Sequence, residues 1–350
     1  MTLTDLRDAP GVGTPLDAFG AVDRALPYGV QLRQIPAAAA AFRSEFLTTG
    51  MPDSVVTKDL VTLPYPTRFG LWRAALTPSP YLSITNRMLV IRWPGNVLVF
   101  EPSDYERGEY TPYFARLNAQ TPGVVQNRIV TRHGTVLENL AELGIAPEEV
   151  TYLAFDHLHT QDVRRWIGTT TEPGAFPNAK LVVQRDELDA IADLHPLQLP
   201  WYQPETYTDL RVEAVAAIDG DVLLGPGVAL IATPGHTFGN QSLVLSTNDG
   251  VWAVSENVIA VEAMVPEHSK IPGVAKSAKT WGREFVLNTN TPEGLADQYN
   301  SLLKEKCLVD RSQRNADFPQ FLPSSELTPS AYFPGTKPTF VHGSLTHRST

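Results

Sequence analysis

Residues 154–166 read AFDHLHTQDVRRW and place two histidines, a glutamine and an aspartate within six positions. The preceding run VTYLAF, at 150–155, is almost entirely apolar, as is typical of a short buried strand. The polar cluster therefore follows the carboxyl end of a predicted strand. Histidines two positions apart on an extended loop can both turn toward one ion. Such a pair alone, however, is more often a pair of surface or hydrogen-bonded side chains.

Three later segments also end predicted strands in side chains that can bind a metal. The turn ATPGHTFGNQS, at 232–242, carries His236 between glycines, which allow a tight turn at a strand end. Glu256 follows the apolar run GVWAVS, and His342 follows TFV. The sequence thus predicts that four strand ends converge on one polar site.

The segments around these strand ends alternate between strand and helix patterns. The runs RMLVIRW (87–93) and VLVFEPSD (97–104) are joined by the turn residues PGN, which predicts a β-hairpin. Residues 133–147 place leucines at helical spacing before a glycine and a proline, which predicts an amphipathic helix with its stop signals. Further strands are predicted at 179–184, 227–233, 241–247, 250–255 and 338–343, and further helices from Asp162, at 185–194 and at 293–309.

Residues 1–85 differ from the rest because they are rich in proline and aromatic side chains. We expect irregular segments and short edge strands here rather than regular helices. This part is predicted to form an N-terminal elaboration that packs on a core made by residues 86–350.

Over about residues 85–345 the order and spacing of these motifs resemble the metallo-β-lactamase superfamily, nearest to its lactonases and hydroxyacylglutathione hydrolases. The resemblance rests on the hairpin, on LENLAELGIAPEEVTYLAFDHLHTQD (137–162), on TPGHTFGNQSLVL (233–245) and on GVWAVSEN (250–257). It implies an α/β fold, the four-layer αβ/βα sandwich of two mixed β-sheets, with a metal site at one edge. Residues 86–350 would then be the catalytic domain.

The loop departs from the HxHxDH pattern of the superfamily. Gln161 stands where the pattern has its aspartate, Asp162 where it has its third histidine, and Glu256 where it has its bridging aspartate. We expect Gln161 to form a hydrogen bond to a ligand instead of binding the metal itself, because neutral amides are weak metal donors. Asp156 is expected to hold a histidine in the same way. Asp162 has a second interpretation, as the cap of the helix that follows it.

The resemblance implies a first ion bound by three imidazoles and one carboxylate, those of His157, His159, His236 and Glu256. A second ion would rest on Asp162, His342 and the shared Glu256, with Gln161 as a weak further donor. We prefer two ions, with a one-ion site as the alternative. These ligand types suit Zn²⁺ and also Fe or Mn.

Metal-assisted hydrolysis is the simplest chemistry for such a site, because the chain has no nucleophile elbow, P-loop or convincing dinucleotide fingerprint. We expect a metallo-hydrolase in which metal-bound hydroxide cleaves an ester, lactone or related acyl bond of a small molecule. Asp162 and Glu256 would transfer protons. Two alternatives stay open: an iron-dependent redox enzyme or oxygenase of the same fold, and a non-catalytic metal-binding relative.

The composition limits the partners of the protein. A formal net charge of −10 and the lack of a long basic run argue against nucleic acid binding. Cys307 is the only cysteine, so no intrachain disulfide can form. The sequence has neither a signal-peptide nor a membrane-spanning pattern, and we expect a cytoplasmic protein with a small-molecule substrate. The oligomeric state stays open, with a homodimer as one option.

Overall fold

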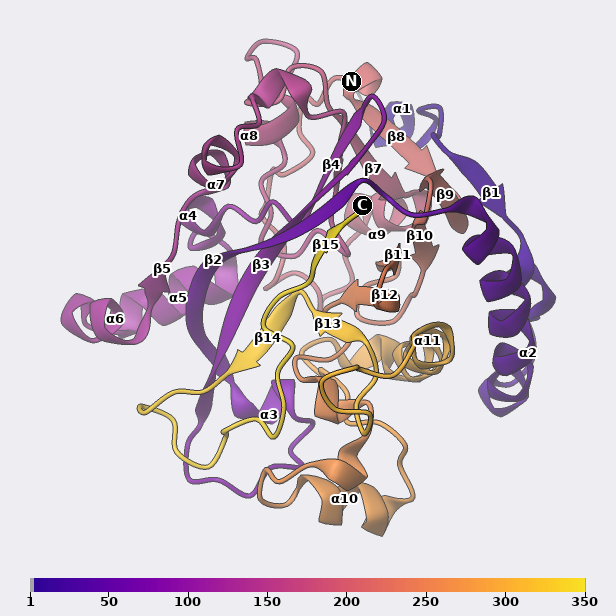
Figure 1. Ribbon diagram of the computed structural model, residues 1–350. Helices are drawn as coiled ribbons and strands as arrows, with labels where there is room; N and C mark the ends of the chain where they lie inside the picture. Colours follow the sequence, from indigo (N-terminus) through magenta and orange to yellow (C-terminus); the bar gives the residue numbers. More distant parts are fainter. Residues whose placement is uncertain (1–2, 350) are drawn as a thin grey trace.

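Two mixed β-sheets lie face to face in the structure, a computed structural model that describes residues 3–349 (Figure 1). Within these residues the larger sheet has nine strands. Seven of them lie in the order β15 (Thr346–Arg348), β2 (Ser54–Pro66), β3 (Tyr81–Trp93), β4 (Asn96–Phe100), β6 (Tyr152–Ala154), β7 (Lys180–Gln184) and β8 (Val215–Ile218). The other two are β14 (Ser325–Thr328), which pairs with β3, and β5 (Thr131–Arg132), which pairs with β2.

The smaller sheet has six strands in the same described part of the chain. Their order is β1 (Thr14–Leu16), β9 (Asp221–Gly225), β10 (Val228–Ala232), β11 (Gln241–Thr247), β12 (Gly250–Ser255) and β13 (Phe321–Pro323). Neighbours pair antiparallel except β12 and β13, which are parallel. The carboxyl ends of β12 and β13 therefore reach the same edge of this sheet.

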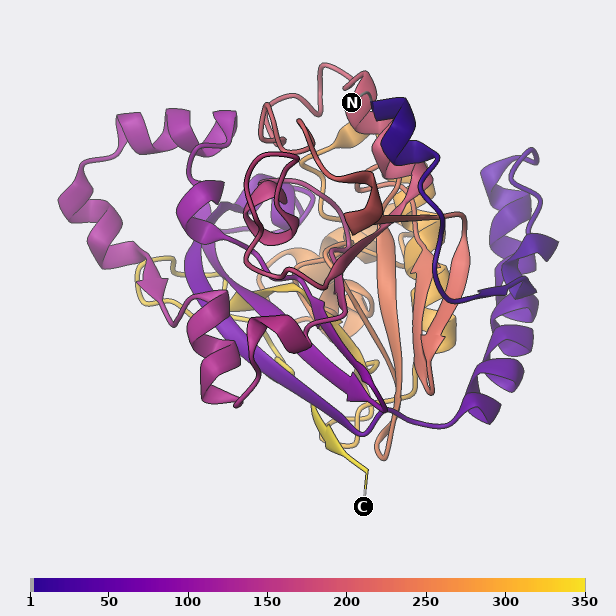
Figure 2. The ribbon, with the colours of Figure 1, turned by 90° about the horizontal axis from the view of Figure 1, so that it is seen from above.

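Helices flank the two sheets, as Figure 2 shows from above. They are α1 (Leu3–Arg7), α2 (Tyr28–Phe46), α3 (Thr67–Gly70), α4 (Tyr105–Gly108), α5 (Pro112–Gln120), α6 (Gly123–Ile129), α7 (Val136–Glu142), α8 (Arg164–Ile167), α9 (Arg185–Ala192), α10 (Val274–Trp281) and α11 (Leu295–Leu308). None of these helices, within residues 3–349, combines the length and the apolar character needed to cross a membrane.

The side chains of β3 explain how the layers are stacked. Met88 and Val90 pack in one hydrophobic cluster with residues of α1, α7 and α9. Leu89 and Ile91 pack in another cluster with residues of β10 and β11 from the facing sheet. Successive side chains of a strand point to opposite faces, so this strand is buried on both faces. A third cluster joins the far face of the smaller sheet to α2 and α11.

This arrangement confirms the predicted four-layer sandwich of two mixed sheets. The predicted hairpin is β3 and β4, which pair antiparallel from Leu89 to Trp93. The predicted helix at 133–147 is α7, and it begins with a capping box in which Thr135 and Glu138 exchange hydrogen bonds.

The prediction of irregular segments and short edge strands at 1–85 is wrong in two places. Residues 28–46 form α2, although Pro36 lies inside it, and the alanine run that follows this proline favours a helix. Residues 54–66 form a long strand that pairs with β3 along its length. Its last residues, including Pro64 and Pro66, pair with β3 only, so these prolines remove no hydrogen bond from a second neighbour. The boundary drawn after residue 85 falls inside β3.

The prediction of a final strand at 338–343 is also wrong. The last strand of the described chain is β15, at the edge beside β2. Two carboxylates accept hydrogen bonds from backbone N–H groups that would otherwise donate to a neighbouring strand. Thr339 donates to Glu262, and His342 and Gly343 donate to the two oxygens of Glu326 at 2.9 and 3.0 Å. The segment is therefore held in place without joining a sheet.

Candidate metal centre

Three imidazoles meet where β6 and β10 end. His157 and His159 lie in the loop after β6, and His236 lies in the loop between β10 and β11. One nitrogen atom from each residue lies within 4.8 Å of the other two. The ring centroid of His157 lies 4.5 Å from that of His159 and 4.4 Å from that of His236. The structure thus brings together, fully buried, the three histidines predicted to bind the first ion.

Gly235 places His236 in this cluster. Its φ of +135° lies in the region that favours glycine, and a Cβ atom there would lie 2.1 Å from the backbone nitrogen of Gln298 in α11. A larger residue would therefore push this turn away from the helix. The close approach of the loop to α11 fixes the position from which the His236 ring projects.

Buried acceptors fix the direction of the other two rings. Nδ1–H of His157 donates to the carboxylate of Asp156, which leaves Nε2 for the site. Nε2–H of His159 donates to Oε1 of Gln198 at 2.6 Å, so Nδ1 of His159 is the nitrogen left for the site. Partners of this kind set the tautomer and orientation of metal-ligating histidines. Asp156 thus lies where the sequence predicted, whereas Gln198 was missed because a single glutamine in a loop belongs to no motif.

The electrostatics of the cluster suit a cation. Two causes hold the pKa of His159 and of His236 well below the usual range. Burial is the larger, and the charge of the neighbouring His157 is the smaller, so both rings are neutral. Burial also lowers the pKa of His157, but the Asp156 carboxylate outweighs it and raises this pKa to about 9. Both ring nitrogens of His236 are buried, and neither has a hydrogen-bond partner among residues 3–349. Neutral imidazoles with free nitrogens beside a carboxylate-backed histidine fit a divalent metal ion.

Glu187 joins the two histidine loops and was not predicted. Its Oε1 accepts hydrogen bonds from the backbone N–H of Leu158 at 3.0 Å and from the Tyr202 hydroxyl at 2.7 Å. Its Oε2 accepts the Thr237 hydroxyl at 2.6 Å and the backbone N–H of Gly239 at 3.2 Å. The side chain is completely buried at the start of α9. It holds both loops through one carboxylate, a role that leaves no signature in the sequence.

Glu256 lies beside the imidazoles at the end of β12. Its Oε1 lies 4.0 Å from Nε2 of His236, and its Oε2 accepts the hydroxyl of Ser325 at 2.6 Å. Burial raises the pKa of Glu256 above its ordinary value. Ser325 follows β13, the parallel neighbour of β12. Glu256, the predicted fourth ligand, therefore lies next to His236 but outside the group formed by the three histidines.

Asp162 lies in an ion-pair network. Its Oδ1 accepts Nε of Arg164 at 2.8 Å, and its Oδ2 accepts guanidinium nitrogens of Arg107 at 2.7 Å and of Arg164 at 2.9 Å. Oδ1 also accepts the backbone N–H of Arg164 at 3.2 Å, but the residue that caps α8 is Val163, so the interpretation of Asp162 as the helix cap is wrong. These partners hold the pKa of Asp162 below its usual range, although burial opposes them. The structure does not group Asp162 with the three histidines.

His342 and Gln161 also have protein partners. Nε2–H of His342 donates to the Pro319 carbonyl at 2.8 Å, and its ring packs between Trp252 and Phe340. Among the described residues, His342 is not part of the imidazole cluster. Nε2 of Gln161 donates to the Ser103 hydroxyl at 3.0 Å, while its buried Oε1 has no partner.

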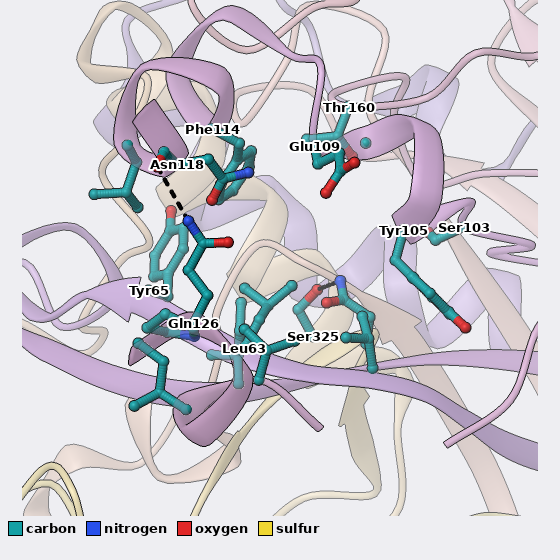
Figure 3. A pocket seen from close by; sticks show the side chains of 18 of the residues that line it. Leu63, Tyr65, Ser103, Tyr105, Glu109, Phe114, Asn118, Gln126, Thr160 and Ser325 are labelled. Atoms are coloured by element: carbon teal, nitrogen blue, oxygen red, sulfur yellow. Dashed lines mark hydrogen bonds between the residues drawn. The ribbon is translucent and has the colours of Figure 1, made fainter. Parts of the chain in front are cut away.

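A cavity of about 530 Å³ opens at the imidazoles. Its polar end includes His157, His159 and Glu256, and its walls continue along apolar side chains of β2, β3, α5 and α6. Figure 3 shows Tyr65 and Phe114 on one side of this space, with Tyr105 on the other. The cavity therefore joins a site for a polar reacting group to a chamber suited to an apolar chain.

Comparisons with known proteins give relatives of one kind. The chain is 30% identical over 118 residues to an N-acyl homoserine lactonase from Bacillus sp, and 29% identical over 120 residues to one from Bacillus cereus. Each match covers 34% of this chain and 42% of the relative, so it spans less than half of the relatives' length. No family model matches the chain.

One solved structure is similar to this chain over a larger share of its length. AidC, described as a dizinc quorum-quenching lactonase, aligns with a TM-score of 0.51 at 13% identity. The alignment covers 86% of this chain and 96% of AidC. The sequence relatives confirm the resemblance to lactonases, and AidC shares the fold of this chain.

Proposed function

We propose that this protein is a metal-dependent hydrolase that opens a lactone, or cleaves a related ester, bearing an apolar acyl substituent. The observation that carries this proposal is the position of three buried imidazoles and Glu256 at the polar end of an apolar cavity. The N-acyl homoserine lactonases among the relatives support it, because their substrates combine a lactone with an acyl group.

The ion would be held by His157 Nε2, His159 Nδ1, a ring nitrogen of His236 and Glu256 Oε1. Zn²⁺ suits three imidazoles and a carboxylate, as do Fe and Mn. When bound, such an ion lowers the pKa of a water molecule to about 7 and polarises a carbonyl oxygen.

The protein's own residues would bind and orient the substrate. The apolar walls, which include Leu63, Phe114 and Leu117, would hold the acyl chain and exclude water from it. Asn86 and Ser325 line the same cavity near Glu256 and offer polar contacts to the ring or amide. The proton of the attacking water would end on the leaving alkoxide oxygen, and Oε2 of Glu256 would carry it there only by giving up its hydrogen bond to Ser325.

Turnover of defined substrates tests the proposal. Purified protein loaded with Zn²⁺ is incubated with N-acyl homoserine lactones of increasing chain length and with simple aryl esters, and products are followed by mass spectrometry. We expect the hydroxy acid that results from addition of one water, with kcat/KM rising with chain length. His236→Ala is the matched control and should give no product. The absence of turnover of every lactone and ester by metal-loaded wild-type protein would refute the proposal.

A further inference from the structure

We infer that this chain binds one metal ion, and that side chains of the protein occupy the interactions a second ion would need. The inference rests on the proposed metal site and concerns its stoichiometry. It departs from the two-ion arrangement that the sequence favoured and from the dizinc description of AidC.

The first observation in favour of one ion is the set of contacts made by Glu256. A carboxylate that bridges two ions directs one oxygen at each. Here Oε1 faces His236 and accepts only a long hydrogen bond from Asn288 Nδ2, at 3.4 Å, whereas Oε2 accepts the Ser325 hydroxyl at 2.6 Å. Ser325 Oγ in turn accepts Nδ2–H of Asn86 at 2.7 Å, so its own hydrogen is directed at Glu256. The second oxygen of Glu256 is thus satisfied by a protein donor.

The second observation in favour of one ion concerns Asp162. Both of its oxygens accept hydrogen bonds from guanidinium groups, and its side chain is 6% exposed. Moving this carboxylate to a metal would break its three hydrogen bonds to guanidinium groups, whose arginine side chains are partly exposed, at 48% for Arg107 and 26% for Arg164. Asp162 is therefore unsuited to ligate a second ion.

The remaining candidates add no strong ligand. Gln161 offers only a neutral amide oxygen, which is a weak donor to these metals. His342 packs between two aromatic rings, bonds to Pro319, and does not line the cavity. Glu101, another carboxylate that lines the cavity, accepts the Asp156 N–H. In residues 3–349 the three histidines are the one group of three potential ligands close enough to share an ion.

Metal counting on the full-length protein tests the inference. Protein purified without chelator is stripped, titrated with Zn²⁺ and measured by elemental analysis. A Co²⁺-loaded sample is measured by electron paramagnetic resonance. We expect one equivalent per chain and the signal of an isolated high-spin ion. Asp162→Asn and His342→Gln should each keep one equivalent, whereas Glu256→Gln should weaken the binding of that ion.

Two tightly bound equivalents, with spin coupling between two Co²⁺ ions, would overturn the one-ion inference and leave the proposed hydrolase intact. Loss of the second equivalent in Asp162→Asn or His342→Gln would identify the residue that binds it. Binding of no ion would overturn both this inference and the proposed function. If Asp162→Asn does not fold, the wild-type stoichiometry and His342→Gln still decide the question.

Discussion

Oε1 of Gln198 lies 2.6 Å from Nε2 of His159, and the amide nitrogen of the same side chain donates to Glu293 at 2.6 Å and to the His236 carbonyl at 3.3 Å. One glutamine therefore orients one imidazole and holds the loop of another. Because Glu293 accepts from the amide nitrogen, the amide oxygen is the atom directed at His159. This contact keeps Nδ1 of His159 available to a metal ion.

Gln198→Leu should weaken metal binding without preventing folding. Loss of an outer partner of a metal ligand typically costs about 10- to 100-fold in affinity, and we expect an increase in Kd of this size. The measurement is competition with a chromophoric chelator. Gln203→Leu is the control, because Gln203 is buried in the same loop region but donates to the Arg107 carbonyl and to Thr111 instead of to a histidine. Equal Kd values for both variants would contradict the assignment.

His236→Ala should abolish metal binding at concentrations that saturate the wild-type protein. The loss should exceed the roughly 100-fold effect of removing an outer partner, because a ligand itself is removed. Equilibrium dialysis against Zn²⁺ measures it. His268→Ala is the control, since His268 lies outside the cluster with its side chain 41% exposed. Metal retained by the His236 variant would exclude this residue as a ligand.

Glu187→Ala should destabilise the fold. The change leaves four buried donors without their acceptor, and unsatisfied buried donors cost about 1–3 kcal/mol each. We expect the free energy of unfolding to fall by at least about 3 kcal/mol in denaturant titrations of the metal-free protein. Asp189→Ala in the same helix removes a surface ion pair with Arg7 and should cost less than about 1 kcal/mol. Similar values for the two variants would show that Glu187 does not hold the loops.

His342 should make the stability of the protein depend on pH. Burial lowers its pKa from 6.5 to about 4, so the folded state disfavours the protonated ring. Between these values the unfolded chain binds more protons, and the free energy of unfolding falls as the pH decreases. The loss approaches roughly 3 kcal/mol once the pH reaches the folded-state pKa.

Urea titrations over this pH interval test the effect. His342→Gln should reduce the pH dependence by the share of His342 and keep the share of His159 and His236, whose pKa values burial also lowers, whereas the exposed His268→Gln should leave the whole dependence unchanged. A slope in His342→Gln equal to that of the wild type would assign the acid sensitivity to another group.

The parts of the site that the sequence predicted correctly depend on short-range patterns. The run from 150 to 159 combines an apolar strand with two histidines two positions apart, and the glycine before His236 marks the turn that directs its ring. Strand and helix spacing also predicted the hairpin and α7. The errors have two causes. In α2 a local signal, the alanine run, outweighs Pro36, whereas tertiary contacts decide the prolines of β2 and the segment 338–343, where a strand was expected.

The sequence by itself indicated alternating strands and helices and singled out the three imidazoles, because apolar periodicity and the spacing of histidines at strand ends are local properties of the chain. The class of fold followed from the resemblance of these motifs to a known superfamily. Only the tertiary structure decided which carboxylates face these imidazoles. Asp162 is paired with Arg107, which lies 55 positions away in the sequence. Glu256 accepts a hydrogen bond from the hydroxyl of Ser325, which lies 69 positions away. The strength of such pairing depends on distance in space and on burial, and a linear sequence specifies neither until the chain has folded.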